Sequence, residues 1–223
     1  MISIIIPTLN EESKVGKLLK NILLLPGDFE AIIVDGGSTD KTLEIIPENI
    51  KIFQTEKGRS TQLNRGAKEA KGDILLFLHA DTTLPVNAVE AVEDVINKGY
   101  IGGRFKVKLD EKGLIYRFIE RGINTRDRFT GGSTGDQALF VKKEIFNEIK
   151  GFKQIPICED LDFARRLKRK GKCLQLPFYV ETSARRWKNS GPIRMILLMW
   201  LIRLGYLFRF PPVKLKKLYG ELR

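Results

Sequence analysis

Short apolar runs alternate with amphipathic segments from the start of the chain to Asp81. The runs at 2–7, 31–34, 50–53 and 74–78 each end in proline or polar residues, which predicts four buried strands. Between them, the spacing of Val15, Leu18, Leu19 and Ile22 predicts an amphipathic helix. Four strands separated by helices favour an α/β fold with a parallel sheet and right-handed crossovers.

Two further helices complete this first half. Thr39 or Asp40 is expected to cap a short helix through Ile46, and a longer helix is expected from Arg59 to Ala70, with Gly72 just beyond its end. Each strand in this half is followed by a polar cluster, and the carboxyl ends of parallel strands lie at the same edge of a sheet. We therefore expect these clusters to converge on one edge.

The second half of the chain is less regular. Its pattern predicts helices at 86–97, 114–123 and 159–170, a half-exposed strand at 105–109, a turn-rich loop at 131–137 and a strand at 138–141. In the helix at 159–170 acidic residues come first and basic residues last, and Gly171 follows. That order complements the helix dipole.

The segment 193–210 is strongly apolar but contains three arginines. Its uninterrupted apolar stretch, from Met195 to Ile202, is too short to span a membrane. At about 100° per residue, Arg203 lies roughly opposite Arg194, so the segment is not a clean amphipathic helix. It either packs on the domain, forms a dimer contact or lies at a membrane interface. We expect an α/β domain over residues 1–190 and a basic, apolar helical extension over 191–223.

Charge and composition narrow the choice of partners. The chain has 223 residues, is 43% hydrophobic and carries a net charge of +12. Ten lysines and arginines but one acid, Glu221, lie from Arg185 onward. Because this charge is mixed with apolar residues such as Trp200, it favours a lipid or protein surface, and we expect no nucleic-acid partner. Two cysteines without metal-ligand spacing and no preceding signal peptide predict a cytoplasmic protein. The basic and apolar C-terminal segment predicts that it associates peripherally with the inner membrane face.

The most informative polar residue is Asp81, which follows the apolar run at 74–78. Mg²⁺ usually binds one or two carboxylates together with substrate phosphates, so Asp81 is a candidate metal ligand. The alternative is an aspartate that caps the turn before Leu84 and Pro85. Polar residues near Thr8, Asp35 and Arg59 are expected at the same edge.

Two segments, at 57–67 and 183–187, resemble a particular small bacterial and archaeal branch of the family 2 glycosyltransferases of the GT-A fold. Four others, in this order, resemble that family over roughly the first 190 residues. These four segments are Pro7-Thr8-Leu9-Asn10-Glu11, Val34-Asp35-Gly36-Gly37-Ser38-Thr39-Asp40, His79-Ala80-Asp81 and Glu159-Asp160. The resemblance implies a Rossmann-like, mostly parallel central sheet flanked by helices. It also implies a hexosyltransferase, an enzyme that transfers a sugar from a nucleotide diphosphate donor with the help of Mg²⁺ or Mn²⁺.

The resemblance implies roles for residues on the donor side. Those expected to bind the nucleotide sugar are Pro7, Thr8, Asn10, Glu11, Asp35, Gly36, Arg59, Ala80 and Asp81. A carboxylate such as Asp35 suits the N–H or hydroxyl groups of uridine, although a turn or cap role is the alternative. The Arg59 guanidinium suits a diphosphate; alternatively it is a solvated surface residue. His79 stands where the family usually has an aspartate, so its contact with metal is in doubt.

On the acceptor side, the resemblance implies that Asp160, next to Glu159, deprotonates the acceptor hydroxyl. Direct displacement with inversion needs one such base and a Lewis acid on the leaving diphosphate. The alternative is that both acids only complement the helix dipole. The remaining residues expected near the sugar or acceptor are Gly135, Asp136, Gln137, Arg186 and Trp187.

The sequence therefore predicts a metal-dependent, inverting glycosyltransferase that uses a UDP-sugar and an unidentified acceptor, with a membrane lipid as the favoured class. A sugar-nucleotide nucleotidyltransferase is one alternative, but it requires a glycine-rich, basic loop after the first strand, and residues 7–12 form neither. A basic protein without enzymatic activity that binds nucleic acid or membrane is the other.

Overall fold

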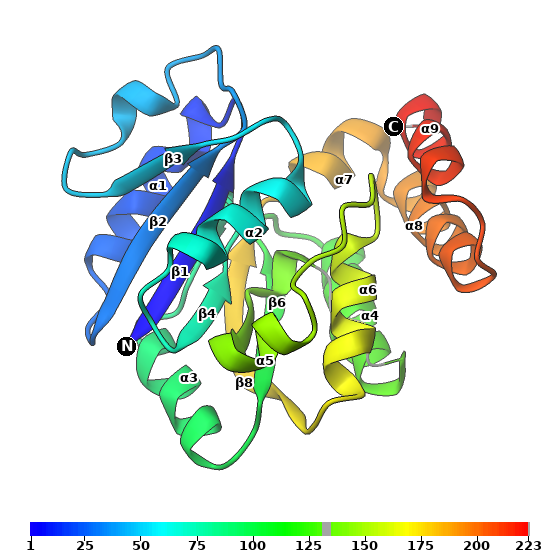
Figure 1. Cartoon of the computed structure of the whole chain (residues 1–223). Helices are drawn as coiled ribbons and strands as arrows, with labels where there is room; N and C mark the ends of the chain where they lie inside the picture. Colours follow the sequence, from blue (N-terminus) through cyan, green and yellow to red (C-terminus); the bar gives the residue numbers. More distant parts are fainter. Residues whose placement is uncertain (131–134, 223) are drawn as a thin grey trace.

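A computed structural model describes residues 1–130 and 135–222, which form an α/β structure around one mixed sheet (Figure 1). The sheet has eight strands in the order β3-β2-β1-β4-β7-β6-β8-β5. The strands are β1 (Ile2–Thr8), β2 (Phe29–Asp35), β3 (Lys51–Gln54), β4 (Ile74–Phe77), β5 (Thr82–Thr83), β6 (Gly102–Leu109), β7 (Leu139–Lys142) and β8 (Cys173–Thr182). The helices are α1 (Glu12–Leu23), α2 (Arg59–Glu69), α3 (Ala88–Asn97), α4 (Leu114–Thr130), α5 (Lys143–Glu148), α6 (Glu159–Lys168), α7 (Arg185–Ser190), α8 (Pro192–Leu207) and α9 (Pro212–Leu222), with short 3-10 turns η1 (Leu43–Ile45) and η2 (Gly135–Gln137).

The first four strands form the parallel part of the sheet, as the hydrophobic pattern predicts. β1 pairs in parallel with β2 and β4, and β2 pairs in parallel with β3. All four residues of β4 are buried, which confirms a strand covered on both faces. Thr8 pairs with Asp35, so the polar residues that follow β1 and β2 meet at one edge.

The second half of the sheet is mixed. β7 runs antiparallel to β4 and β6, β8 runs parallel to β6, and β5 runs antiparallel to β8. The sequence pattern did not predict β8, because Pro177 interrupts a run with no regular alternation. The structure places Pro177 at a register shift, where Gln175 pairs with Arg104 but Tyr179 pairs with Lys106. The bulge accommodates a residue that has no N–H to give to the ladder.

Most predicted helices and strands are present, with three corrections. The expected helix through Ile46 is only the 3-10 turn η1; its N-cap is Thr42, so the predicted caps Thr39 and Asp40 were wrong. The Asp40 carboxylate instead accepts a hydrogen bond from the Thr42 backbone N–H at 3.0 Å. The strand expected at 105–109 begins at Gly102, and six of its eight residues are buried rather than half-exposed. The helix expected to end at residue 123 extends to Thr130.

Helices cover both faces of the sheet and enclose two apolar clusters. α1, α3 and α4 cover one face, where Ile4, Val15 and Phe105 belong to the larger cluster. On the other face, under α2, α5 and α6, the rings of Phe152 and Phe163 stack with centroids 4.4 Å apart. A Cβ at Gly66 of α2 would collide with Ile5 of β1, so glycine allows the helix to lie close to the sheet.

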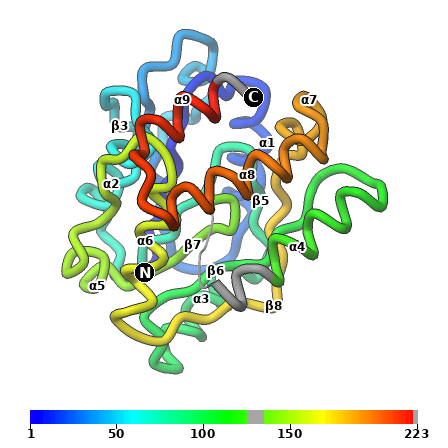
Figure 2. Tube along the Cα trace, turned by 90° about the vertical axis from the view of Figure 1, so that its right-hand side faces the viewer, coloured from blue at the N-terminus to red at the C-terminus, as the bar shows by residue number. Residues whose placement is uncertain are grey.

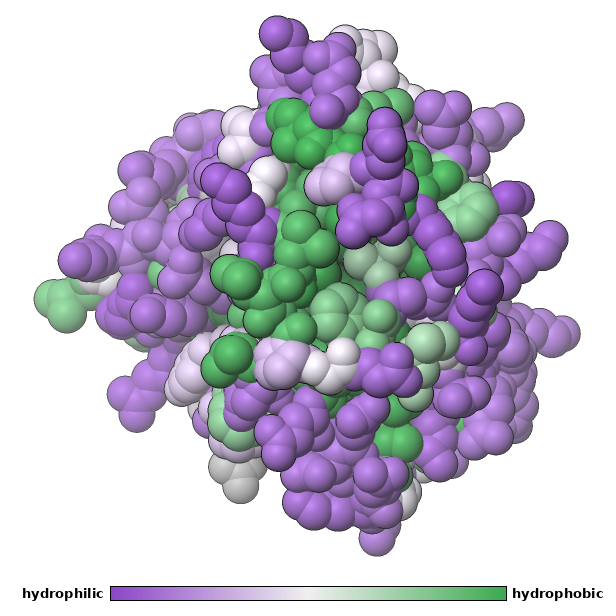
Figure 3. All heavy atoms as spheres, turned by 90° about the vertical axis from the view of Figure 1, so that its left-hand side faces the viewer, coloured by the Kyte–Doolittle hydropathy of each residue, from purple (hydrophilic) through white to green (hydrophobic). Residues whose placement is uncertain are grey.

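The C-terminal helices lie together at one side of the molecule, where Figure 2 shows α8 and α9 in front of α6. A third cluster joins Met195, Leu198 and Ile202 of α8 to Leu215 of α9 and to Cys158, just before α6. Among the described residues, no helix combines the length and the hydrophobicity that a membrane crossing requires. Figure 3 shows the opposite side, where hydrophobic residues fill the centre and hydrophilic ones surround them.

Candidate active site

Asp35, at the carboxyl end of β2, organises the turn that follows this strand. Its fully buried carboxylate accepts hydrogen bonds from the backbone N–H groups of Gly37 and Ser38, both at 2.8 Å. The hydroxyl groups of Ser38 and Thr8 donate to the other carboxylate oxygen at 2.5 and 3.2 Å. Asp35 therefore has the turn role that the sequence left open, and its contact with a nucleoside stays a prediction.

Gln62 supports this turn from below, a role that the motifs did not reveal. Its buried side-chain amide donates to the carbonyls of Thr8, at 2.7 Å, and Val34, at 2.8 Å. A Cβ at Gly36 would lie 3.1 Å from the same amide, so a larger residue would press on it. A polar residue on the buried side of a predicted helix was the only signal in the sequence. The Gln62 amide thus fixes the ends of β1 and β2 relative to one another.

The segment after β1 crosses to the loop after β2. Asn10 has a positive φ of 54°, and its Oδ1 accepts a hydrogen bond from the Thr39 N–H at 2.8 Å. The next residue, Glu11, accepts hydrogen bonds from Arg185 of α7 at 3.4 Å. Burial raises the pKa of Glu11; the Arg185 charge opposes this, and the nearby charge of Asp81 adds to it. Glu11, Arg185 and Asp81 thus meet at this edge.

The predicted metal ligand Asp81 follows β4, and its half-buried side chain lies next to Thr82. No cluster of three or more metal-binding side chains occurs in the described residues. A cation that bridges a donor diphosphate requires only one or two carboxylates, and Asp81 with the nearby Glu11 supplies them. The residues at this edge therefore fit Mg²⁺ or Mn²⁺ held jointly with substrate phosphates. Ala80 is buried between Asp81 and His79.

His79 faces the segment before β7 rather than open solvent. A Cβ on Gly135 would collide with its Nε2 atom, so the two residues are in close contact. Burial and the charges of Arg59 and Arg186 hold the pKa of His79 well below its usual value. The imidazole is therefore neutral at pH 7. His79 therefore lies near two arginines and contacts Gly135, whose N–H bonds to Asp160 at the start of α6.

Asp160 and Glu159 begin α6 and differ in surroundings. Glu159 is buried, burial and the Asp160 charge raise its pKa, and Arg59 lies 3.8 Å away. Asp160 is only partly buried; its Oδ2 accepts a hydrogen bond from the Gly135 N–H at 2.8 Å and its Oδ1 from the Leu161 N–H at 2.7 Å. A carboxylate offers about four acceptor positions, so capacity remains for a further donor.

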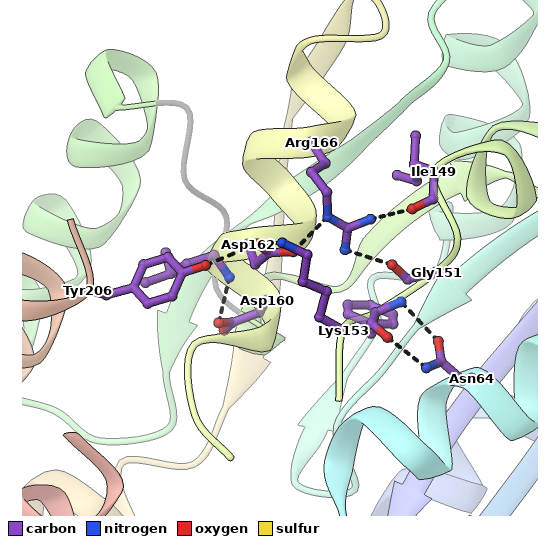
Figure 4. Close-up of polar contacts among 10 residues, drawn as sticks. Asn64, Ile149, Gly151, Lys153, Asp160, Asp162, Arg166 and Tyr206 are labelled. Carbon is purple, nitrogen blue, oxygen red and sulfur yellow. Dashed lines mark hydrogen bonds and ion pairs between the residues drawn. The ribbon is translucent and has the colours of Figure 1, made fainter. Parts of the chain in front are cut away.

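A polar network holds the first turn of α6 in place (Figure 4). Asp162 accepts hydrogen bonds from Arg166 Nε at 2.6 Å, Lys153 Nζ at 3.0 Å and the Tyr206 hydroxyl at 3.0 Å. Arg166 also donates to the carbonyls of Ile149 and Gly151. Asp162 thus connects α6 with the preceding loop and with α8.

The other residues predicted on the acceptor side have different surroundings. Gly135, Asp136 and Gln137 form η2, whereas residues 131–134 of the predicted loop lie outside the described residues. The Oδ1 atom of Asp136 is buried and has no hydrogen-bond partner among the residues that the structure describes. Trp187 packs against two apolar clusters, while Arg186 is exposed near His79. Contact of these residues with sugar or acceptor stays a prediction.

Several of the predicted residues therefore lie close together at one edge. Asp81 is near Glu11, Glu11 contacts Arg185, His79 is near Arg59 and Arg186 and contacts Gly135, and Gly135 contacts Asp160. Two cavities of about 700 and 890 Å³ lie elsewhere and contain none of these residues. The edge carries both carboxylates and arginines, which are the charges needed to bind a phosphorylated ligand near a carboxylate base.

Comparison with known proteins shows which family and which fold the chain resembles. The family model described as Glycosyl transferase family 2 matches residues 3–152. A Mycobacterium tuberculosis PGL/p-HBAD biosynthesis glycosyltransferase is 44% identical over 38% of this chain and 36% of its own length. A Methanococcus voltae dolichyl N-acetyl-alpha-D-glucosaminyl phosphate 3-beta-D-2,3-diacetamido-2,3-dideoxy-beta-D-glucuronosyltransferase is 42% identical over 35% and 28%. An uncharacterized glycosyltransferase of Haemophilus influenzae is 30% identical over 75% and 62%. The chain spans about a third of the length of the first curated relatives it matches.

Solved structures share the fold. The mannosyltransferase PcManGT from Pyrobaculum calidifontis, in complex with GDP-Man and Mn²⁺, has a TM-score of 0.71 and 17% identity over 99% of this chain and 69% of its own. S. aureus TarS 1–349, in complex with UDP-GlcNAc, has a TM-score of 0.67 and 20% identity over 82% and 58%. These similarities establish a GT-A architecture for the mixed sheet and its flanking helices.

Proposed function

Because the chain belongs to glycosyl transferase family 2, we propose that it transfers a sugar from a nucleotide diphosphate donor to a hydroxyl acceptor, with inversion at the sugar carbon. The observation that carries this proposal is the placement of Asp160. Its carboxylate is partly exposed, is oriented by two backbone N–H groups and lies on the same edge as Asp81 and the Asp35 turn. The proposal assigns leaving-group stabilisation to one end of the edge and deprotonation to the other.

On the donor side, the proposal uses the edge from Thr8 to Asp81. The Asp35 turn and Asn10 would bind the nucleoside, with UDP as the expected nucleotide. Asp81 would hold Mg²⁺ or Mn²⁺ against the diphosphate, and Arg59 and Arg186 would add positive charge there. A cation at this position supplies Lewis-acid stabilisation of the leaving diphosphate. Solved GT-A neighbours in complex with UDP-GlcNAc, or with GDP-Man and Mn²⁺, support the class of donor.

On the acceptor side, Asp160 rather than Glu159 would take the proton from the acceptor hydroxyl. Glu159 is buried with Arg59 3.8 Å away, so an acceptor hydroxyl has little access to it, whereas Asp160 is partly exposed and has unused acceptor positions. The hydroxyl oxygen then attacks the sugar carbon as the bond to the diphosphate breaks. A single step of this kind inverts the configuration.

A lipid-linked acceptor at the inner face of a membrane is the class that we propose. The name of the Methanococcus voltae relative begins with dolichyl N-acetyl-alpha-D-glucosaminyl phosphate, and that of a Photorhabdus laumondii relative, an undecaprenyl-phosphate 4-deoxy-4-formamido-L-arabinose transferase, includes undecaprenyl phosphate; both support this class. The basic and apolar character of residues 185–220 agrees with an acceptor of this class. The proposal therefore describes a peripheral membrane enzyme.

Ligand-induced thermal shifts with two matched variants test the function. We expect a UDP-sugar with Mn²⁺ to raise the melting temperature more than UDP-sugar alone, and GDP- and dTDP-sugars to raise it less. Asp81→Asn should remove the Mn²⁺-dependent part, because an amide is a poor ligand for a hard cation. Asp160→Asn should keep the full shift while sugar transfer falls by about 10²-fold or more.

The two variants separate the two halves of the proposal. A shift that is the same with and without Mn²⁺ in the unmodified protein would remove the metal role of Asp81. Undiminished transfer by Asp160→Asn would mean that the carboxylate only complements the helix dipole. No shift with any nucleotide sugar, at any metal concentration, would contradict the function itself.

A further inference from the structure

The outer face of α8 exposes a continuous stripe of large apolar side chains. Ile193, Leu197 and Phe208 are 69%, 66% and 71% exposed. The full stripe, with its continuation beyond the helix, consists of Ile193, Leu197, Trp200, Leu201, Leu204, Leu207, Phe208, Phe210 and Val213. We call these residues the α8 ridge. Monomeric proteins rarely expose contiguous apolar surface of this kind unless it binds something.

The helix has two opposite apolar faces, and this explains the positions of its arginines. Met195, Leu198 and Ile202 are buried in the cluster shared with α9 and Cys158, and the ridge lies on the other side. At about 100° per residue, Arg194 and Arg203 are half a turn apart and lie on the two boundaries between these faces. Packing on the domain therefore accounts for one apolar face and leaves the other unexplained.

The charge around the ridge indicates what covers it. From Arg185 to Gly220 the chain contains nine lysines and arginines and no aspartate or glutamate. Arg194, Arg209, Lys214 and Lys216 are exposed next to the ridge. Two copies that paired through this surface would bring like charges together, which costs binding energy, whereas an anionic lipid surface attracts them. Apolar side chains framed by cations match the layered chemistry of a membrane interface.

The ridge is also connected to the edge that holds Asp81, His79 and Asp160, which we call the catalytic edge. The buried face of α8 packs near Ile157, Cys158 and Leu161, which precede and follow Asp160. Tyr206 of α8 donates a hydrogen bond to Asp162, two residues after Asp160 (Figure 4). Figure 2 shows α4 beside α8, and Leu114 and Phe118 in its first turns are 90% and 69% exposed. The acceptor side is therefore the side from which a lipid would approach.

We propose that the α8 ridge docks on an anionic bilayer surface, with its apolar side chains among the lipid chains and its cations at the headgroups. The proposal rests on the proposed function, since it explains how a lipid-linked acceptor reaches Asp160. The helix would lie in the interface and not cross it. Exposed apolar side chains leave water on docking, which supplies the salt-independent part of the binding.

Vesicle co-sedimentation of the full chain tests this surface. The two vesicle types are phosphatidylcholine alone and phosphatidylcholine mixed with phosphatidylglycerol. We expect binding to the anionic vesicles that weakens as salt is raised, and at least about tenfold weaker binding to the neutral ones. The double variant Leu197→Glu with Leu204→Glu should bind anionic vesicles at least about tenfold less, since it places two charges on the ridge.

A matched control places the same two charges elsewhere. Leu23 and Leu24, at the end of α1, are 54% and 79% exposed and do not belong to the ridge. Leu23→Glu with Leu24→Glu should bind vesicles like the unmodified protein. All three proteins should show the same thermal shift with UDP-sugar and Mn²⁺, which reports folding and donor binding independently of lipid.

The opposing outcomes are distinct. Equal vesicle binding by the ridge variant and the control, or no binding by the unmodified protein, would overturn the proposal. A dimer in sedimentation velocity that only the ridge variant dissociates would assign the surface to a second copy instead. Vesicle binding without any nucleotide-sugar shift would contradict glycosyl transfer but leave the membrane surface standing.

Discussion

Carboxylates at the catalytic edge are oriented by backbone N–H groups from the segments around them. Asp35 receives two such bonds from the turn that follows β2, and Asp160 receives one from Leu161 and one from Gly135. Such charge-assisted bonds fix an acid without a basic partner beside it. The two carboxylates differ in their remaining hydrogen-bond acceptor positions. The hydroxyls of Thr8 and Ser38 also donate to Asp35, whereas Asp160 keeps free acceptor positions. This difference suits a structural acid and a reactive one.

Glu30 offers a pH test of the parallel sheet away from the catalytic edge. Burial alone would raise its pKa, but hydrogen bonds from Lys51, from the Lys71 N–H and from Ser3 lower it to about 2. Because the folded pKa lies below the unfolded value of about 4.5, its contribution to stability is present above pH 4.5 and is lost as pH falls toward 2. We expect Glu30→Gln to lower the free energy of unfolding at pH 7 by about 1–3 kcal/mol.

Urea denaturation at a series of pH values measures this effect. The difference between Glu30→Gln and the unmodified protein should shrink steadily below pH 4.5. Glu44→Gln, on the exposed turn η1, serves as the control and should leave stability unchanged at every pH. A constant difference down to pH 2.5 would contradict the assigned role of Glu30 in holding Lys51 and Lys71.

Residues in linear motifs were predictable, and residues that act through the fold were not. The positions of Asp81 and Asp160 were predictable because each lies where a recognisable element begins or ends with a polar break, and their chemical roles stay predictions. Gln62 has no such signal, since its role depends on two carbonyls that belong to different strands. Arg185 likewise reaches Glu11 across 174 positions of sequence. Contacts of this length depend on how elements pack, which a local pattern does not contain.

Among the elements, α8 is joined to α6 by a hydrogen bond from Tyr206 as well as by apolar packing. The Tyr206 hydroxyl donates to the buried carboxylate of Asp162, and its own pKa is raised to about 12, mainly by burial and by that charge. It therefore remains a donor across the working pH range. Tyr206→Phe removes this donor while Arg166 and Lys153 still neutralise Asp162. We expect a loss of about 1–3 kcal/mol in the free energy of unfolding, the usual value for a bond to a charged group.

Chemical denaturation and sugar transfer together measure the effect. If the bond also positions the start of α6, transfer should fall at saturating donor while the Michaelis constant for the donor stays the same. Tyr179→Phe is the control, because Tyr179 is 51% exposed on β8 and its ring lies near Lys106. Unchanged stability and transfer in Tyr206→Phe would show that α8 and α6 are not coupled through this bond.

Elements with one exposed face were predictable, and elements with unusual surroundings were not. The buried positions of α1 are the four that the helical spacing indicates, because one face meets the sheet and the other meets water. β8 contains Pro177 and three consecutive exposed positions, and α8 is apolar on two opposite faces. Their patterns reflect a bulge and a second contact surface, and neither follows from periodicity alone.

At the scale of the whole molecule, the start of α6 contacts both the catalytic edge and the C-terminal helices. The acids and arginines of the edge converge from both halves of the sheet, since Glu11 and Asp81 come from the parallel half and Arg185 follows β8. The C-terminal helices add exposed apolar residues and basic residues next to the start of α6. The proposed division into residues 1–190 and 191–223 therefore separates two sequence compositions that share one apolar cluster.

Truncation after Asn189 tests how independent those two parts are. It removes Met195, Leu198 and Ile202, whose buried side chains cover Cys158 beside the candidate base Asp160. It also removes the Tyr206 donor to Asp162. Large core side chains each contribute about 2–5 kcal/mol when deleted, so we expect a clearly lower melting temperature and weaker transfer. Donor binding, whose residues lie before Asn189, should persist at low temperature, as the shift with UDP-sugar and Mn²⁺ would measure. The ridge variant Leu197→Glu with Leu204→Glu is the control, because it alters only the outer face of α8. A truncated protein as stable and as active as the full chain would mean that residues 191–223 form a separate appendage whose only role is at the membrane.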